Sequence, residues 1–261
     1  MSEPSKIYFA SDLHLGAPNK TKSREREELF IQWLNVIEKD AAALYLVGDV
    51  FDFWFEYGTV VPKGHVRLLG KLAALSDSGV EIHYFTGNHD IWTFGYLAEE
   101  IGMTVHYNPI EREWNGKRFF IGHGDGLGPG DYGYKRLKKL FQSRLCQWMF
   151  KWIHPDIGIR IASFFSNHSR DNQPEFERNY LGDENEWLVQ YSKRKLEQEH
   201  FDYFIFGHRH LALDIELNEN SRYINLGDWI RFTSYAVFDG QDLRLDYFSA
   251  NPQSELESSG E

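Results

Sequence analysis

Five short polar motifs recur along the chain, and each follows a short apolar run. In order they are Asp12-Leu13-His14, Gly48-Asp49, Gly87-Asn88-His89-Asp90, Gly122-His123-Gly124-Asp125 and Gly207-His208-Arg209-His210. A short apolar run that ends in glycine and polar residues is typical of a buried strand followed by a loop. We therefore expect several strand ends that carry histidine, aspartate and asparagine, a set of side chains that suits divalent metal ions.

The first half of the chain alternates strand and helix patterns. Residues 6–10, 42–47 and 80–85 are apolar runs of strand length, while residues 27–37 and 66–75 place apolar side chains at helical spacing. This βαβαβ order predicts a parallel sheet, and functional side chains then lie at the carboxyl ends of its strands.

The second half predicts a second, mixed sheet. Residues 104–106, 111–114 and 118–121 are short strand-like runs, and Asn115-Gly116 favours a type I′ turn between the last two. Further strand-like runs follow at positions 203–206, 211–217, 222–224, 235–238 and 243–248. Two facing sheets with helices outside would bury all of these runs, so we expect an α/β fold.

A basic and apolar segment, residues 132–170, lies between the fourth and fifth motifs. It holds eight basic residues against one acidic residue, a balance of +7 inside a chain whose net charge is −11. Pro155 and Gly158 predict a division into two helices. The first carries an apolar face of Leu137, Leu140, Phe141, Leu145, Trp148, Met149 and Trp152, and the second continues through Ile161, Phe164 and Phe165.

This segment has two compatible interpretations. In the first, it is an amphipathic cap that packs on the core. In the second, it is a surface that binds an anionic, lipid-like ligand or a membrane. We expect one domain over residues 1–250, with the helical cap inserted at about 132–170 and extending at most to residue 200. Residues 251–261 are polar and acidic, which predicts a disordered tail.

Composition narrows the class of protein. A net charge of −11 argues against nucleic-acid binding, because phosphate neutralisation needs a basic surface. The single cysteine, Cys146, excludes an internal disulfide and fits a reducing compartment. The first six residues lack the apolar stretch of a secretory signal, and no run has the roughly 18 apolar residues of a membrane span. We expect a cytoplasmic protein, or a peripheral one on the inner face of the inner membrane.

The order of the five motifs resembles that of the calcineurin-like metallophosphoesterase superfamily. The resemblance covers nearly the whole chain except the cap. It implies a four-layer αββα sandwich, in agreement with the two facing sheets, and a site for two divalent cations. Manganese is the first expectation for these cations, with iron, zinc and cobalt as alternatives, because imidazole and carboxylate donors accept all of them.

The resemblance also implies a role for each matching residue. Asp12, His14 and His210 correspond to the ligands of one metal, Asn88, His123 and His208 to those of the other, and Asp49 to a bridge. His89 takes the position of the catalytic histidine, and Asp90 is expected to orient its imidazole. Expected substrate contacts are Asn88, His89, Asp131 and His208. Asp52, Asp125 and Asp228 either support ligating histidines or are ordinary loop carboxylates.

Two further segments resemble a subfamily. Gly48-Asp49-Val50-Phe51-Asp52-Phe53-Trp54 and Asn225-Leu226-Gly227-Asp228-Trp229, with the basic insert between them, are similar to the UDP-2,3-diacylglucosamine pyrophosphatases of lipid A biosynthesis. That resemblance implies hydrolysis of a nucleotide-linked lipid to UMP and 2,3-diacylglucosamine 1-phosphate at a membrane surface, with no obligate protein partner.

This chain departs from the subfamily at two places. It has His89 where well-known members have arginine, and the run Gly126-Leu127-Gly128-Pro129-Gly130-Asp131 differs from their run. Two alternatives therefore stay open. One is a soluble metal-dependent phosphodiesterase or nucleotidase, and the other is a metal-scaffolded interaction module without catalysis.

Overall fold

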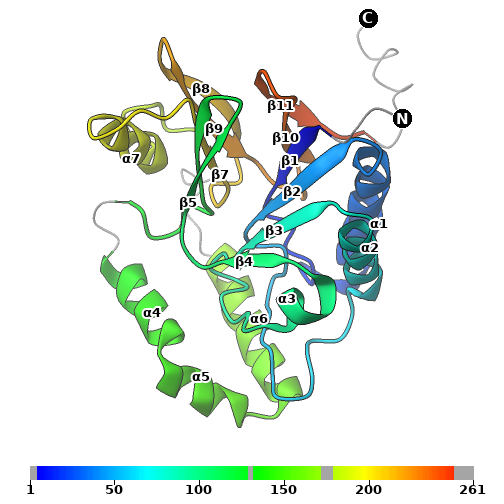
Figure 1. The fold of residues 1–261 in the computed structure, drawn as a ribbon. Coiled ribbons are helices and arrows are strands. Elements are labelled where there is room, and N and C mark those ends of the chain that lie inside the picture. Colours follow the sequence, from blue (N-terminus) through cyan, green and yellow to red (C-terminus); the bar gives the residue numbers. More distant parts are fainter. Residues whose placement is uncertain (1–4, 129–131, 172–178, 250–261) are drawn as a thin grey trace, which may run out of the picture.

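Two β-sheets face each other in the computed structural model, which describes residues 5–128, 132–171 and 179–249 (Figure 1). The first sheet has the strand order β11-β10-β1-β2-β3-β4. Its strands are β1 (Lys6–Ala10), β2 (Ala41–Val47), β3 (Glu81–Phe85), β4 (Thr104–His106), β10 (Ser234–Phe238) and β11 (Leu243–Tyr247). The strands β1 to β4 are parallel, which confirms the expectation from the βαβαβ pattern.

The second sheet has the order β5-β6-β7-β9-β8. Its strands are β5 (Ile110–Trp114), β6 (Lys117–Ile121), β7 (Tyr203–Phe206), β8 (Ala212–Asn218) and β9 (Ser221–Leu226). The turn between β5 and β6 has positive φ angles of 51° at Asn115 and 75° at Gly116, as a type I′ turn requires. Between the two sheets lies an apolar core that includes Phe9, Tyr45, Phe85, Phe119 and Ile205.

Helices cover the outer face of each sheet (Figure 1). On the first sheet lie α1 (Lys20–Ile37), α2 (Val66–Asp77) and α3 (Tyr96–Ile101), and on the second lies α7 (Trp187–Leu196). The four-layer αββα sandwich is therefore confirmed. The helix α3 was not expected, because six residues between Gly95 and Gly102 are too short to show a helical period.

Three helices form the cap at one end of the sheets: α4 (Tyr132–Gln142), α5 (Arg144–Lys151) and α6 (Pro155–Asp171). The expectation of two helices was wrong. The backbone at Ser143 is extended, with φ −64° and ψ 128°, and this ends α4 and redirects the chain into α5. None of the helices in the described ranges is both long and apolar enough to cross a bilayer.

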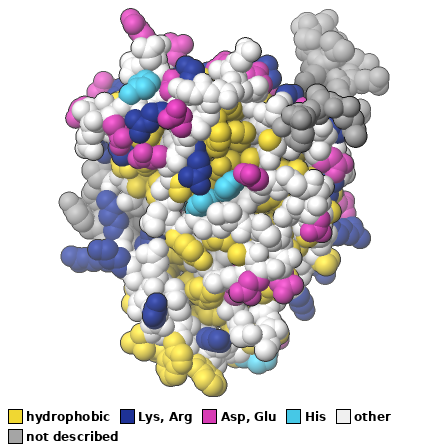
Figure 2. All heavy atoms as spheres, viewed as in Figure 1, with side chains coloured by type: hydrophobic (Ala, Val, Ile, Leu, Met, Phe, Trp, Pro, Cys, Tyr) yellow, Lys and Arg dark blue, Asp and Glu magenta, His cyan; other side chains and the backbone are white. Residues whose placement is uncertain are grey.

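Much of the expected apolar face of the cap is exposed. Figure 2 shows hydrophobic side chains gathered at the end of the molecule where Figure 1 places α5. The expectation that the cap packs on the core is confirmed for two of its side chains. Phe141 and Phe150 contact a cluster of Phe55, Ile91 and Trp92. The exposed apolar residues of the cap, here called the cap surface, are Leu140, Leu145, Trp148, Met149, Trp152, Ile157, Ile161 and Phe164.

Candidate metal centre

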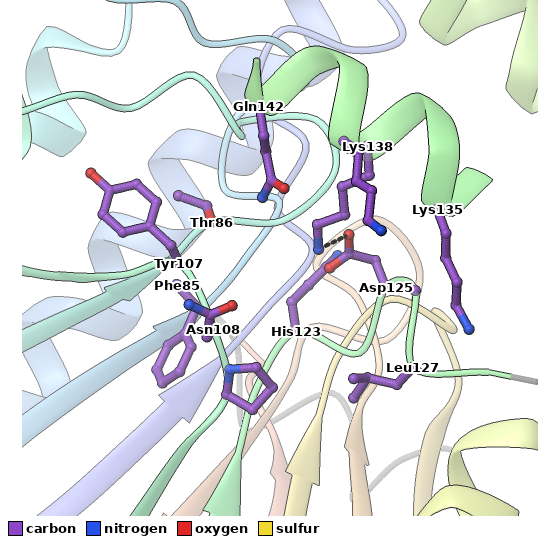
Figure 3. Close-up of a pocket in the computed structure, with 13 residues that line it drawn as sticks. Phe85, Thr86, Tyr107, Asn108, His123, Asp125, Leu127, Lys135, Lys138 and Gln142 are labelled. Atoms are coloured by element: carbon purple, nitrogen blue, oxygen red, sulfur yellow. Dashed lines mark hydrogen bonds and ion pairs between the residues drawn. The ribbon is translucent and has the colours of Figure 1, made fainter. Parts of the chain in front are cut away.

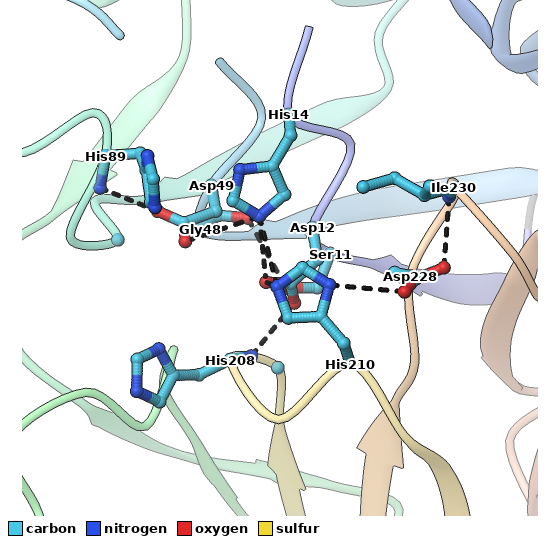
Figure 4. Close-up of polar contacts among 12 residues, drawn as sticks. Ser11, Asp12, His14, Gly48, Asp49, His89, His208, His210, Asp228 and Ile230 are labelled. Atoms are coloured by element: carbon cyan, nitrogen blue, oxygen red, sulfur yellow. Dashed lines mark hydrogen bonds and ion pairs between the residues drawn. The ribbon is translucent and has the colours of Figure 1, made fainter. Parts of the chain in front are cut away.

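The polar motifs meet at one edge of the sandwich. The loops after the parallel strands β1, β2 and β3 carry Asp12, His14, Asp49, Asn88 and His89, and those after β6 and β7 carry His123, His208 and His210. The carboxyl ends of parallel strands lie at the same edge of a sheet. In both sheets this edge is at the same end of the sandwich, so the side chains of one sheet face those of the other. Figure 4 shows most of them converging on a small region.

The first group of donor atoms comes from Asp12, His14 and His210. The Nε2 atoms of the two histidines lie 3.2 Å apart, and Asp12 Oδ1 lies 3.6 Å from His14 Nε2 and 3.4 Å from His210 Nε2. Metal–ligand bonds of about 2.0–2.2 Å place neighbouring donor atoms on one ion roughly 3–3.6 Å apart. Asp12 Oδ1 is buried without a hydrogen-bond partner among the described residues, which is costly unless a cation neutralises it. These atoms fit one divalent cation.

The second group involves Asn88, His123 and His208. His123 Nε2 lies 3.3 Å from Asn88 Oδ1 and 3.3 Å from Asp49 Oδ2. A ring nitrogen of His208 lies within 4.8 Å of donor atoms of His123 and Asp49. The amide oxygen, the carboxylate and the two imidazoles form a donor set for a second divalent cation.

Asp49 belongs to both groups through a single oxygen. Its Oδ2 lies 3.7 Å from His14 Nε2 and 3.3 Å from His123 Nε2. Its Oδ1 instead accepts a hydrogen bond of 2.9 Å from the backbone N–H of His89. A Cβ atom at Gly87 would overlap Oδ1, so only glycine lets the third motif approach this carboxylate. The arrangement is that of a carboxylate able to bridge two cations.

Two of the candidate ligating histidines, His123 and His210, are held by a hydrogen bond at their second ring nitrogen. His123 Nδ1 donates to the carbonyl oxygen of Val47 over 2.9 Å, which leaves the Nε2 lone pair facing the centre. His210 Nδ1 lies 3.2 Å from Asp228 Oδ2, and His14 Nδ1 lies 3.5 Å from Asp52 Oδ1. Asp52 and Asp228 thus occupy supporting positions, whereas Asp125 Oδ2 accepts from Lys138 Nζ at 2.6 Å.

Five of the expected ligands have strained backbones. Their φ angles are positive, in the left-handed region that residues with a Cβ rarely adopt. Such strain costs free energy and collects at functional sites, where the surrounding structure holds it in place. The angles are 56° at Asp12, 44° at His14, 52° at Asp49, 67° at His208 and 52° at His210.

The charges of the centre are strongly coupled. Burial alone would lower the pKa of His14 and His123, but the neighbouring carboxylates outweigh it and raise both pKa values to about 10. Burial alone would raise the pKa of Asp12, but nearby histidines lower it to about 2. Burial and the charge of His123 lower the pKa of His208 to about 4. Without metal, two of the ligating imidazoles therefore carry protons that a bound cation must displace.

His89 lies beside the centre, but Asp90 does not orient its ring. The Asp90 oxygens accept from the backbone N–H groups of Val50 and Gly87 and from the Tyr84 hydroxyl. The nitrogen His89 Nδ1 instead lies 3.0 Å from the carbonyl oxygen of Asp52. The expected contact between Asp90 and the imidazole is wrong, because this carboxylate is taken up by its own loop, by the loop after β2 and by the Tyr84 hydroxyl.

The cap supplies a residue that the sequence did not reveal. Ser166 on α6 donates to the Asp52 carboxylate at 3.1 and 3.2 Å, and its Oγ lies 3.4 Å from His89 Nδ1. Nothing in the local sequence marks this serine, since it comes from the cap and not from a motif. Asp131, an expected substrate contact, lies outside the described residues.

Comparison with known proteins agrees with this geometry. Residues 5–212 match the family Calcineurin-like phosphoesterase. A UDP-2,3-diacylglucosamine hydrolase of Porphyromonas gingivalis is 42% identical over 254 residues, which cover 93% of this chain and 97% of that protein. Proteins of the same name from Vibrio vulnificus and Ectopseudomonas mendocina are 32% and 28% identical, over 63% and 94% of this chain and 66% and 99% of their own lengths. The chain belongs to the calcineurin-like phosphoesterase family and is a metal-dependent hydrolase.

Proposed function

We propose that this protein hydrolyses the pyrophosphate bond of UDP-2,3-diacylglucosamine to give UMP and 2,3-diacylglucosamine 1-phosphate. The observation that carries the proposal is the 42% identity with the Porphyromonas gingivalis hydrolase, which extends over nearly the full length of both chains. The metal centre and the exposed apolar cap beside it supply the chemistry that such a substrate needs.

The proposed cofactors are two divalent cations, with Mn²⁺ as the first choice and Fe²⁺, Zn²⁺ or Co²⁺ as substitutes. Such ions supply a nucleophilic water at neutral pH and offset the charge of a phosphate group. The assignment of ligands is the one that the family resemblance implies: Asp12, His14 and His210 for one ion, Asn88, His123 and His208 for the other, and Asp49 for both.

His89 is the proposed catalytic residue. The Asp52 carbonyl oxygen can only accept a hydrogen bond, so it holds the proton of His89 on Nδ1. The nitrogen Nε2 is then the one that can reach a phosphate oxygen of the substrate. We assign Asn88 and His208 to contacts with the same phosphate, and Asp131 remains a proposed substrate contact.

The cap surface is proposed to hold the acyl chains and to meet the membrane from which the lipid comes. Trp152 is 76% exposed and Trp148 59% exposed, which is unusual for residues of this size. Exposed cations of the cap, Arg136, Arg144 and Lys151, suit the anionic surface of a bilayer. An aromatic and basic surface of this kind supports peripheral binding to a membrane.

Incubation with UDP-2,3-diacylglucosamine and Mn²⁺ tests the proposal. The expected products are UMP and the lipid phosphate, in amounts that rise together with time. Protein carrying Asp49→Ala should release neither product and serves as the control for contaminating hydrolases. Turnover of small phosphodiesters without release of UMP from the lipid would contradict the substrate and indicate a soluble phosphodiesterase.

A further inference from the structure

Two hollows lie near the metal centre and have no lining residue in common. The first has a volume of about 280 Å³ and includes the ligand His123 in its lining, together with Thr86, Asn108, Asp125, Lys138 and Gln142. The second has a volume of about 470 Å³ and reaches Asp52, which supports His14 and His89. A pyrophosphate attacked at the centre has two halves, and each half needs its own space.

The helix α4 presents a polar face to the first hollow. Lys135, Lys138, Lys139 and Gln142 line it, and their spacing of three and four residues places them on one side of the helix. Figure 3 shows Lys138 reaching Asp125, with which it forms an ion pair of 2.6 Å. Lys135 donates to the carbonyl oxygen of Gly128 at 2.6 Å, and Asp125 is the one carboxylate among the described residues of the lining, so three like charges at this spacing face a single acid. An anion in the hollow would relieve the repulsion between them.

Amide side chains face the same space from two walls. Asn108 follows β4 and Gln142 ends α4, and Figure 3 shows their side chains directed toward the hollow from opposite sides. Both residues are exposed, and neither side-chain amide forms a hydrogen bond with the rest of the described chain. An amide offers both donors and an acceptor. Two of them match the alternating carbonyl and N–H groups on the edge of a pyrimidine base.

The second hollow has a mixed lining. Phe53 and Ile159 lie in it beside the charged residues Lys63, Asp156 and Arg160, and the residues from 156 to 160 belong to α6. The same helix carries Ile157, Ile161 and Phe164 of the cap surface, which are 55%, 42% and 65% exposed. The helix that borders the second hollow therefore also carries exposed apolar side chains that can hold acyl chains, whereas the residues of α4 that line the first hollow are lysines and a glutamine.

We propose that the first hollow is the nucleotide subsite and takes a pyrimidine nucleoside monophosphate. The phosphate lies toward His123 and the lysines of α4, and the base lies toward Asn108 and Gln142. The lipid half then leaves through the second hollow. This inference rests on the proposed function, because it assigns the two halves of that substrate to the two sides of the metal centre.

Equilibrium binding of UMP and of inorganic phosphate to the Mn²⁺-loaded protein tests the inference. Phosphate reports on the metal centre and the lysines beside it, while the extra affinity of UMP reports on the part of the hollow that would hold the nucleoside. We expect wild-type protein to bind UMP at least ten-fold more tightly than phosphate. The double variant Asn108→Ala with Gln142→Ala should weaken UMP about ten-fold, because two hydrogen bonds are lost, and should leave phosphate binding unchanged.

Matched variants control for general effects. Asn35→Ala with Gln198→Ala removes the same two amides from exposed positions on α1 and after α7, and should leave both affinities at the wild-type value. Lys139→Glu should weaken UMP several-fold, whereas Arg144→Glu on α5 makes the same change of charge elsewhere in the cap and should not.

Three results would overturn the inference. The first is that wild-type protein binds UMP and phosphate with equal affinity. The second is that the double variant of Asn108 and Gln142 keeps the wild-type ratio of UMP affinity to phosphate affinity. The third is that Arg160→Ala, in the second hollow, abolishes UMP binding while the double variant does not. Failure of the proposed function looks different. In that case wild-type protein releases no UMP from the lipid substrate, yet its UMP affinity still depends on Asn108 and Gln142.

Discussion

In the metal centre most donor side chains are fixed at a second atom, whereas in the cap many large side chains contact little beyond their own helix. Asp12, for example, is fully buried and its Oδ2 accepts from Ser11 Oγ and the backbone N–H of His208. Trp152 of the cap is 76% exposed. The centre is thus organised before any ligand arrives, while the cap keeps apolar surface for a ligand to cover.

Hydrogen bonds and aromatic contacts join the two regions. Trp92 Nε1 donates to the carbonyl oxygen of Phe141 at 2.8 Å, and the ring of Phe150 packs 4.8 Å from that of Phe55. Ser166 adds the hydrogen bonds to Asp52 beside the centre. Variants of the centre should therefore affect every substrate, variants of the cap surface should affect lipid substrates, and variants of the junction should affect catalysis without loss of metal.

Replacing Asp49 should have the largest effect. Asp49→Ala removes Oδ2, which lies near donor atoms of both groups, so we expect fewer than two bound metal ions and a loss of turnover of about a thousand-fold or more. Metal content by elemental analysis and turnover of a small phosphodiester are the measurements. Asp77→Ala, at an exposed position on α2, is the matched control. Two metal equivalents bound to Asp49→Ala protein would contradict the bridging role.

His89 should separate catalysis from metal binding. In His89→Ala protein we expect both metal ions to remain, while turnover falls by roughly 10²–10⁴-fold, the usual contribution of a general acid or base. His154→Ala removes an exposed imidazole from the cap and should leave turnover unchanged. Wild-type turnover in His89→Ala protein would show that the imidazole takes no part in the reaction.

Replacing two tryptophans of the cap surface should separate the substrates. Trp148→Asp with Trp152→Asp adds charge where acyl chains or lipid would lie, so turnover of UDP-2,3-diacylglucosamine should fall by about ten-fold to a hundred-fold. Turnover of a small phosphodiester should fall far less. Tyr247→Asp, at an exposed position on β11, controls for the added charge. Equal losses with both substrates would mean that the cap supports the centre and does not bind lipid.

The convergence of the first motifs was predictable from the sequence because each motif follows its strand directly. Parallel strands bring their carboxyl ends to one edge, which places His14 and Asp49 close together. The approach of His123 from the second sheet was implied only by the family resemblance. The same reasoning failed for Asp90. Adjacent residues of a tight loop point in different directions, and this carboxylate accepts from Gly87 N–H three residues earlier at 2.7 Å.

Contacts made by the cap were beyond the reach of sequence patterns. The periodicity of the apolar residues between 137 and 152 fits one helix as well as two, and only the extended backbone at Ser143 decides between them. Ser166 meets Asp52 across 114 residues of chain, in a contact that depends on how α6 seats on the centre. Local propensity carries no information about such long-range packing.

Ser166 tests the junction between the regions. Ser166→Ala should lower turnover about three-fold to ten-fold through His89, because Asp52 and the imidazole lose a shared partner. The same change should have no effect in a His89→Ala background, where its target is gone. Ser166→Thr keeps a hydroxyl and should restore part of the activity. Ser192→Ala, a buried serine on α7, is the matched control, and independent losses in the double variant would contradict the coupling.

The smallest effect should be on the pH dependence of stability, and it should come from His83 and His106, which are not among the candidate metal ligands. His83 Nδ1 lies 3.0 Å from His106 Nε2, and burial lowers the pKa of each from 6.5 to about 4. The folded protein therefore binds fewer protons than the unfolded chain, so this contribution to stability is complete above pH 6.5 and is lost as the pH falls toward 4. His106→Gln should make the decrease in the free energy of unfolding between pH 7 and pH 5 shallower, as measured by urea unfolding. His200→Gln, at an exposed position, should leave it unchanged, and an equally steep decrease in His106→Gln protein would contradict the assignment.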